Sequence, residues 1–321
     1  MNFSLEKSWK NYSRKKMVKS SSNHPRIVFF GTPFFGRVIL ENLLADNFKV
    51  VGVVTQPDKP IGREQKMTPS PVKILAKKEK IPVLTPTNKQ ELMAASKRLL
   101  TNKPDLFVIA AYGMIIPAQT LSIPKRRVIN VHPSLLPKYR GASPIQAAIL
   151  RGGEETGVTI MLTDEEMDHG PILSQQKTPI APNETTPSLT EKLALLGGQL
   201  LTATIPSYIK GEITPQSQNH ELATFTKLIK KEDGRVEWKT GNDLIERMVR
   251  AYNPWPGVWT TIGEMANQLN QNLRNPKHEN LKLKILTAHL ENGTLSLDLV
   301  QVEGKKPISF ADFSKGYLKQ I

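Results

Sequence analysis

The sequence predicts an α/β domain built on a mostly parallel, Rossmann-like sheet, followed by a smaller β-rich domain. Short apolar segments rich in β-branched residues alternate with helix-like segments from Arg26 to about residue 205, and the alternation then stops. A chain of 321 residues is also long for a single hydrophobic core, which favours two domains.

The elements of the first domain are predicted from apolar periodicity. Strands are expected at "RIVFF", "KVVGVVT", "DLFVIAAYG", "VINVH", "GVTIMLT" and "GPILSQQKTPI". Helices are expected at "GTPFFGRVILENLLAD", "PSPVKILAKKEK", "SPIQAAILRGG" and over about residues 187–210. Strands separated by helices require right-handed crossovers, so we expect most neighbouring strands to be parallel.

Composition divides the chain into four segments. Residues 1–25 hold six Lys or Arg against one Glu, and we expect a basic, disordered extension there. The α/β domain covers residues 26–205. Residues 206–225 have no clear period and are interpreted as a linker. Residues 226–321 contain alternating segments such as "LKLKILTAHL" and "GTLSLDLVQVEG", typical of a small β barrel.

Charge and cysteine content limit the function classes. The net charge of +15 favours a polyanionic partner, most simply a nucleic acid or a membrane surface. The chain contains no cysteine, which excludes disulfides, thiolate metal sites and a cysteine nucleophile. Because the sequence shows no apolar run long enough to cross a bilayer, we expect a soluble protein.

The first strand leads into the glycine-containing loop "FFGTPFFG". The loop lacks the G-x-G-x-x-G pattern of dinucleotide-binding proteins, and Arg37 follows Gly36 where a P-loop requires Lys and then Ser or Thr. A dehydrogenase and a nucleoside triphosphatase are therefore disfavoured. We interpret this loop as a tight turn from a strand into a helix, with Pro33 suited to the start of the helix.

The strand "VINVH" ends in two polar residues that are candidates for catalysis. Asn130 and His132 are two residues apart on a strand, so their side chains share one face at the sheet edge where ligands collect. Asp168, in the non-helical "TDEEMDHGPIL", could fix the tautomer of the imidazole. This set contains no nucleophile, but it can polarise a carbonyl and transfer protons, which suits acyl transfer between two bound substrates.

Two alternatives compete with that interpretation. A lone Asn or His at a strand end is more often a hydrogen-bonded structural residue. His132, Asp164, Asp168 and His169 could also hold a metal, but none of the usual metal-ligand spacings is present, so we expect no metal site.

Long segments of the chain resemble a known family from about Arg26 to the C-terminus. The segments "NVHPSLLPKYRGASPIQAAI" and "GVTIMLTDEEMDHGPIL" resemble the formyltetrahydrofolate-dependent formyltransferases. Three further segments, "FFGTP", "VVTQPDKPIGREQKMTPSPVK" and "RAYNPWPGVWT", are similar to the members of that family that formylate methionyl-tRNA.

The resemblance implies a reaction and a catalytic trio. It implies transfer of the formyl group of 10-formyltetrahydrofolate to the α-amino group of initiator methionyl-tRNA, in translation initiation. Asn130, His132 and Asp168 match the family's trio, and Asp168 is chosen over Asp164 because it carries the D-x-G pattern. The folate serves as a co-substrate, and no metal is implied.

The resemblance also implies binding residues for each substrate. The folate residues that it implies are Ser134, Leu135, Leu136, Pro137, Tyr112, Gly113, Met114 and Ile115. Contacts to tRNA are expected from Arg63, Lys66, Lys227, Lys230, Lys231 and Arg247. The second domain would be an OB-like, tRNA-binding barrel, although this chain is shorter than the family between "LTAHLENG" and "LSLDLVQVEGKKP".

Two other functions stay open at this point. The chain could formylate an amino sugar nucleotide or another small amine, or it could be a non-catalytic RNA-binding protein. We expect a monomer without membrane contact, in the bacterial cytoplasm rather than an organelle matrix.

Overall fold

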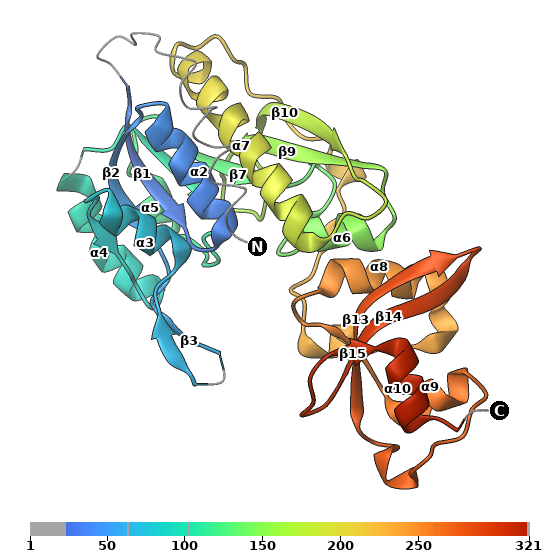
Figure 1. Ribbon diagram of the computed structural model, residues 1–321. Coiled ribbons are helices and arrows are strands. Elements are labelled where there is room, and N and C mark those ends of the chain that lie inside the picture. The colour runs from blue at the N-terminus through green and yellow to red at the C-terminus, as the bar shows by residue number, and fades with distance from the viewer. Residues whose placement is uncertain (1–23, 63, 102, 320–321) are drawn as a thin grey trace. The chain divides into compact units, whose positions relative to one another are not determined.

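The computed structural model describes residues 24–62, 64–101 and 103–319 (Figure 1). The predicted extension over residues 1–25 therefore lies almost wholly outside the described residues, as does Arg63. The chain forms two compact units, which we describe separately. Unit 1 comprises Met1–His132, Thr159–Gln175 and Ala194–Gln218, and unit 2 comprises Pro133–Val158, Gln176–Leu193 and Asn219–Ile321.

A seven-stranded sheet with the order β10-β9-β7-β6-β1-β2-β5 forms the framework of the α/β region (Figure 1). Its strands are β1 (Arg26–Gly31), β2 (Lys49–Val54), β5 (Val83–Leu84), β6 (Leu106–Ala110), β7 (Val128–His132), β9 (Glu155–Leu162) and β10 (Ile172–Pro179). Strands β7, β6, β1, β2 and β5 pair in parallel, whereas β9 is antiparallel to β7. The predicted Rossmann-like, mostly parallel sheet is confirmed.

Helices lie between these strands and after the last of them, and four of the six form where the periodicity predicts them. They are α2 (Phe34–Ala45), α3 (Pro71–Lys78), α4 (Lys89–Thr101), α5 (Ala118–Leu121), α6 (Pro144–Leu150) and α7 (Thr186–Ile209). Helix α3 has a complete start signal, since the Ser70 hydroxyl accepts a hydrogen bond from the Lys73 N–H and Pro71 takes the first helical position. A short exposed hairpin, β3 (Lys59–Ile61) with β4 (Lys66–Thr68), precedes α3.

The core of unit 1 lies where β-branched and aromatic residues of the central strands meet α4. Phe30, Phe107 and Tyr112 are buried together there with Leu92 and Leu99 of α4. The ring centroids of Phe30 and Tyr112 are 5.6 Å apart, and the rings meet edge to face. Each of the central strands is covered by apolar neighbours. The sequence of such a strand is therefore a continuous apolar run and does not alternate between apolar and polar residues.

The loop after β1 is a close-packed turn. A side-chain carbon added at Gly36 would lie 2.7 Å from the Ala110 carbonyl oxygen, and one at Gly31 would lie 2.9 Å from the same atom. The glycines of "FFGTPFFG" therefore allow α2 to approach the end of β6 closely. This agrees with the interpretation of the loop as a turn.

Unit 2 contains a second, antiparallel sheet with the order β12-β13-β14-β15. Its elements are β12 (Val258–Thr261), β13 (Lys282–Glu291), β14 (Thr294–Val302) and β15 (Ile308–Ser309), with helices α8 (Asn242–Tyr252), α9 (Ile262–Gln268) and α10 (Phe310–Tyr317). In the part of the chain that the structure describes, no pairing joins β12 to β15, so the sheet is open. The expected OB-like barrel is thus not closed, because four strands are one fewer than that barrel needs.

Smaller elements complete unit 2. A two-residue strand β8 (Arg140–Gly141) pairs in parallel with β11 (Phe225–Thr226). Four short 3-10 helices are η1 (His220–Leu222), η2 (Lys231–Gly234), η3 (Trp238–Thr240) and η4 (Pro276–His278). Among the described residues, no helix combines the length and the apolar character that a membrane crossing requires.

Candidate active site

Asn130, His132 and Asp168 come together in unit 1. The Asn130 amide donates a hydrogen bond to Oδ1 of Asp168 over 3.2 Å, and Nδ1 of His132 lies 3.5 Å from the same oxygen. The His132 residue is only 4% exposed, so its imidazole is shielded from water. An amide and an imidazole two residues apart on β7 thus meet at one carboxylate oxygen.

The antiparallel pairing of β9 explains how Asp168 reaches the two side chains. Leu162, at the end of β9, pairs with Ile129, and the next residue donates its N–H to the Val128 carbonyl over 2.8 Å. The loop of residues 163–171 therefore starts beside the beginning of β7. It then brings Asp168 against Asn130 and His132, which lie further along β7.

The neighbouring acid Asp164 is engaged elsewhere. Its Oδ2 lies 2.7 Å from Nδ1 of His169, and its Oδ1 accepts the Glu166 N–H over 3.1 Å. The two carboxylates of this loop therefore have different partners, and Asp168 is the one that lies beside His132. In residues 24–62, 64–101 and 103–319, no group of three or more His, Cys, Asp and Glu side chains could hold a metal ion.

The backbone of this loop is unusual at Asp168. Its φ of 52° lies in the left-handed region, which costs a residue with a side chain about 1–2 kcal/mol. Two residues later, a side-chain carbon at Gly170 would lie 2.0 Å from the Leu162 carbonyl oxygen. The loop is held by Gln218, whose Nε2 donates to the main-chain oxygens of Asp168 and Gly170 over 2.9 and 2.8 Å.

Residues 112–115, one predicted part of the folate site, follow β6 in unit 1. Tyr112 is buried in the core, and this burial raises the pKa of its phenol to about 12. Gly113 has a φ of 80°, Met114 packs against the core, and Ile115 is 66% exposed. Gln56 fixes the backbone of this segment, because its Nε2 donates to the Tyr112 and Gly113 oxygens over 3.2 and 2.9 Å.

The other predicted folate segment, residues 134–137, lies in unit 2 and directly follows His132 in the chain. The fully buried Ser134 hydroxyl donates to the Lys138 oxygen over 2.6 Å, which closes the segment into a turn. Leu135 is half-buried, Leu136 is buried, and the Leu136–Pro137 bond is cis. The segment is therefore an ordered loop with apolar side chains.

The cations predicted to contact tRNA have different surroundings. Lys66 is exposed on β4, and Lys230 and Lys231 are exposed in unit 2. The Lys227 ammonium is 2.8 Å from Oδ1 of Asp233, and this hydrogen bond raises the pKa of Lys227 above its usual value. Arg247 is half-buried, and its Nε donates to the Leu150 oxygen over 2.9 Å at the end of α6.

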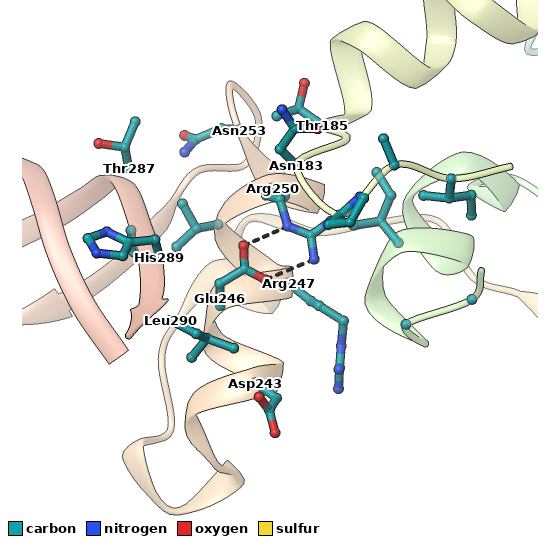
Figure 2. Close-up of a pocket in the computed structure, with 18 of the residues that line it drawn as sticks. Asn183, Thr185, Asp243, Glu246, Arg247, Arg250, Asn253, Thr287, His289 and Leu290 are labelled. Atoms are coloured by element: carbon teal, nitrogen blue, oxygen red, sulfur yellow. Dashed lines mark hydrogen bonds and ion pairs between the residues drawn. The ribbon is translucent and has the colours of Figure 1, made fainter. Parts of the chain in front are cut away.

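Arg247 also lines a hollow of about 700 Å³ within unit 2 (Figure 2). Apolar walls come from residues such as Ile149, Ile180 and Leu286. The other arginine of this wall, Arg250, is held in a bidentate pair with Glu246 over 2.6 and 2.8 Å. The Glu246 carboxylate thus offsets the positive charge of Arg250 inside the hollow. Arg247 contributes a second guanidinium to the lining.

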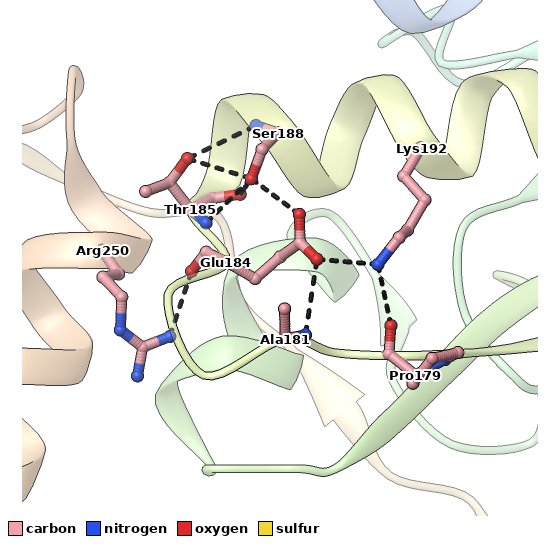
Figure 3. Close-up of polar contacts among 7 residues, drawn as sticks. All are labelled: Pro179, Ala181, Glu184, Thr185, Ser188, Lys192 and Arg250. Atoms are coloured by element: carbon pink, nitrogen blue, oxygen red, sulfur yellow. Dashed lines mark hydrogen bonds and ion pairs between the residues drawn. The ribbon is translucent and has the colours of Figure 1, made fainter.

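A buried carboxylate anchors the segment before α7 in the same unit (Figure 3). Oε1 of Glu184 accepts the Ser188 hydroxyl over 2.7 Å, and its Oε2 accepts the Lys192 ammonium over 2.7 Å. The Glu184 main-chain oxygen accepts Nη1 of Arg250 over 3.0 Å. Burial pushes the pKa of Glu184 upward, but these donors, chiefly Lys192, outweigh it and leave the pKa below its usual value.

Sequence reasoning missed Gln218 and Gln56. Gln218 stands in the segment interpreted as a linker, and Gln56 stands in a polar loop. Each acts by donating to main-chain oxygens about 50 residues away along the chain. A glutamine that bonds main-chain groups leaves no periodicity or motif, so only the folded chain reveals it.

Comparison with known proteins matches both parts of the chain. Residues 25–205 match the family described as formyl transferase, and residues 228–318 match formyl transferase, C-terminal domain. The methionyl-tRNA formyltransferase of Roseiflexus castenholzii is 44% identical over 300 residues, which cover 91% of this chain and 96% of that protein. The Bacillus cereus protein of the same name is 40% identical over 306 residues, or 92% and 97% of the two chains.

Solved structures support the fold. An N-formyltransferase from Helicobacter canadensis has a TM-score of 0.61 at 22% identity and covers 92% of this chain and 97% of its own. A methionyl-tRNA formyltransferase from Clostridium thermocellum has a TM-score of 0.54 at 18% identity, with coverage of 87% and 98%. The trio geometry and both sequence matches lead to one assignment: the chain belongs to the formyl transferase family, among relatives named as methionyl-tRNA formyltransferases.

Proposed function

We propose that this protein transfers the formyl group of 10-formyltetrahydrofolate to the α-amino group of initiator methionyl-tRNA. One observation supports the chemistry most directly: Asn130 and His132 meet at a single carboxylate oxygen of Asp168. The acceptor is supported by relatives that are 40% and 44% identical over most of the chain and are named as methionyl-tRNA formyltransferases.

The trio can serve the step in which the acceptor amine attacks the formyl carbon. The new N–C bond forms as the bond between the formyl carbon and N10 of the folate breaks, and negative charge develops on the formyl oxygen. An asparagine amide has two N–H donors. One Asn130 N–H is held by Asp168, and the other is available to the oxygen together with His132.

Asp168 has the role of orienting His132 and assisting the proton transfer. The attacking amine loses a proton and the departing folate nitrogen gains one, so the overall reaction needs no outside acid or base. A carboxylate beside the imidazole favours a single tautomer, which presents the other ring nitrogen to the substrates. His132 is buried, and exclusion of water strengthens each of these interactions.

The remaining assignments follow the same proposal. Residues 26–205 form the catalytic domain, residues 206–225 the linker and residues 226–321 the tRNA-binding domain. Residues 112–115 and 134–137 hold the folate. Lys66, Lys227, Lys230, Lys231 and Arg247 contact the tRNA together with Arg63. The protein acts as a monomer in the bacterial cytoplasm.

The test offers three acceptors with 10-formyltetrahydrofolate: initiator methionyl-tRNA, elongator methionyl-tRNA and an amino sugar nucleotide. We expect the initiator to be formylated fastest and the sugar not at all. Formylation of the sugar nucleotide without formylation of methionyl-tRNA would replace this proposal by that of a small-amine formyltransferase.

A variant distinguishes an enzyme from a non-catalytic RNA-binding protein. His132→Ala should abolish formyl transfer and leave tRNA affinity nearly unchanged, because the imidazole acts on the reacting atoms. Full formyl transfer by this variant would refute the proposed site. Absence of turnover in the wild-type protein, with tight tRNA binding, would support the RNA-binding alternative.

A further inference from the structure

Residues 216–218, at the end of unit 1, lie against the loop that carries Asp168. Gln216 and Ile172 exchange both main-chain hydrogen bonds, over 2.7 and 2.9 Å. This bridge places the segment next to the first residue of β10, just after the loop that carries Asp168. The part of the chain that composition marks as a linker is therefore attached to the loop through its backbone.

Two residues further on, the Gln218 side chain enters that loop. Gln218 is only 5% exposed. Its Nε2 donates to the Asp168 oxygen over 2.9 Å and to the Gly170 oxygen over 2.8 Å. A carboxamide nitrogen carries two hydrogens, so these two carbonyls use its full donor capacity.

The two carbonyls flank His169 and belong to the part of the loop with the tightest backbone. Asp168 has a positive φ, and Gly170 has no space for a side chain because of the Leu162 oxygen. The direction of the Asp168 side chain depends on that backbone. A shift of the loop would move the carboxylate oxygen away from Asn130 and His132, which lie at 3.2 and 3.5 Å.

We propose that Gln218 is a positioning residue for formyl transfer: by holding the Asp168 and Gly170 carbonyls, it keeps the Asp168 carboxylate in contact with His132. The inference rests on the proposed function, in which Asp168 orients His132. As a positioning residue, Gln218 touches neither substrate and acts only through Asp168.

The first test is Gln218→Met, which keeps the length of the side chain but removes both donors. We expect kcat to fall about 10- to 100-fold, since a displacement of about 1 Å has a cost of that order. The KM values for folate and tRNA should stay within about twofold, because no binding group is removed. The matched control is Gln216→Met, whose side chain is exposed and whose contacts to Ile172 are main-chain bonds; its kcat should equal that of the wild type.

The second test is Gln218→Glu. An ionised carboxylate has no donor for the two carbonyls, whereas the protonated acid has one O–H. The deficit in kcat relative to the wild type should therefore shrink as the pH is lowered from 8 toward 5. A merely structural defect would give a deficit that is independent of pH or grows on acidification.

A double-mutant cycle tests the route of action. If Gln218 acts only through Asp168, Gln218→Met should add no further loss of kcat in the Asp168→Asn background. Wild-type kcat in Gln218→Met, or a full additional loss in the double variant, would overturn the inference. Either result leaves the proposed function intact, provided that the wild-type protein formylates methionyl-tRNA; lack of that activity would instead refute the function.

Discussion

Two carboxylates, the buried Glu184 of unit 2 and the half-buried Asp168 of unit 1, differ in how they are bound. Glu184 in unit 2 is 7% exposed and accepts hydrogen bonds from Ser188 on one oxygen and Lys192 on the other. Asp168 in unit 1 accepts a hydrogen bond from the Asn130 amide on Oδ1, and Nδ1 of His132 lies 3.5 Å from the same oxygen. Glu184 has a full cation as a partner, whereas Asp168 has an amide and a titratable ring.

The difference separates a structural acid from a functional one. A carboxylate paired with an ammonium and a hydroxyl stabilises the folded state in one charge form. A carboxylate beside an imidazole can remain bound to that ring in either of the ring's protonation states. Loss of Glu184 should therefore be measured mainly in stability, and loss of Asp168 mainly in turnover.

The largest effect is expected for Asp168→Asn. We predict a decrease in kcat of about 10²- to 10⁴-fold, the usual contribution of acid–base groups, with the tRNA KM nearly unchanged. Single-turnover formylation measures it, and thermal unfolding checks that the fold is intact. Asp164→Asn is the matched control, because Asp164 pairs with His169. An equally inactive control variant would mean that the two acids of the loop are not distinguished in function.

A smaller effect, on stability, is expected for Glu184→Gln. The variant should lose about 1–3 kcal/mol of unfolding free energy at pH 7, because it removes charge-assisted hydrogen bonds. The folded-state pKa of Glu184 is depressed, so the wild type has this contribution above the ordinary pKa and loses it as the pH falls through the folded-state pKa. The difference between wild type and variant should thus disappear in acid.

Urea unfolding at several pH values between 7 and 3 measures the Glu184 effect. Glu191→Gln is the control, since Glu191 is exposed on α7, the helix that carries Ser188 and Lys192, and should change stability by less than about 0.5 kcal/mol. The kcat of both variants should match the wild type. A large loss of kcat in Glu184→Gln would show that the second carboxylate is not purely structural.

Gln56→Ala should affect folate binding more weakly. It removes two donors to the backbone of residues 112–113, and we predict an increase in the folate KM of about tenfold, equivalent to one or two ordinary hydrogen bonds. Steady-state kinetics at saturating tRNA measure it. Gln65→Ala is the control, because that exposed side chain bonds the Gly62 oxygen of its own hairpin turn. An unchanged folate KM in Gln56→Ala would argue against residues 112–115 as a folate segment.

The smallest effect is expected from the exposed cations. The double substitution of Lys230 and Lys231 by Ala should raise the tRNA KM a few-fold and lower the salt slope of tRNA binding by about 1–2. Exchange of the exposed pair Lys305 and Lys306 is the control. Equal effects of both pairs would mean that net charge alone attracts the RNA. An unchanged slope in the first variant would exclude the predicted contact.

Sequence reasoning found the strands and the trio because their signals are local. Period-two geometry places Asn130 and His132 on one face, and the resemblance to the family, through its D-x-G pattern, distinguishes Asp168 from Asp164. The structure brings the three predicted side chains together, although their catalytic role stays a prediction. The lysines at 230 and 231 are exposed as a contact surface requires, but exposure does not establish a partner.

Other features could not be predicted because they depend on contacts between distant parts of the chain. The alternation at "LKLKILTAHL" predicts a strand, but it does not tell whether the last strand pairs with the first, and the sheet is open among the described residues. Gln218 and Gln56 bond to main-chain oxygens. Every residue has such an oxygen, so the sequence does not show which one will be bonded. The contact of the linker with β10 has the same origin.

The position of Gln218 has a consequence for recombining the two domains. The family match of the first domain ends at residue 205 and that of the second begins at residue 228, so a chimera is naturally joined between them. A junction placed near residue 206 would take residue 218 from the other parent, and with it a hydrogen-bonding group for the Asp168 loop. A junction after Gln218 takes the Asp168 loop and the Gln218 amide from the same parent. The segment that must be transferred together with the catalytic residues therefore extends beyond residue 205, where the first family match ends.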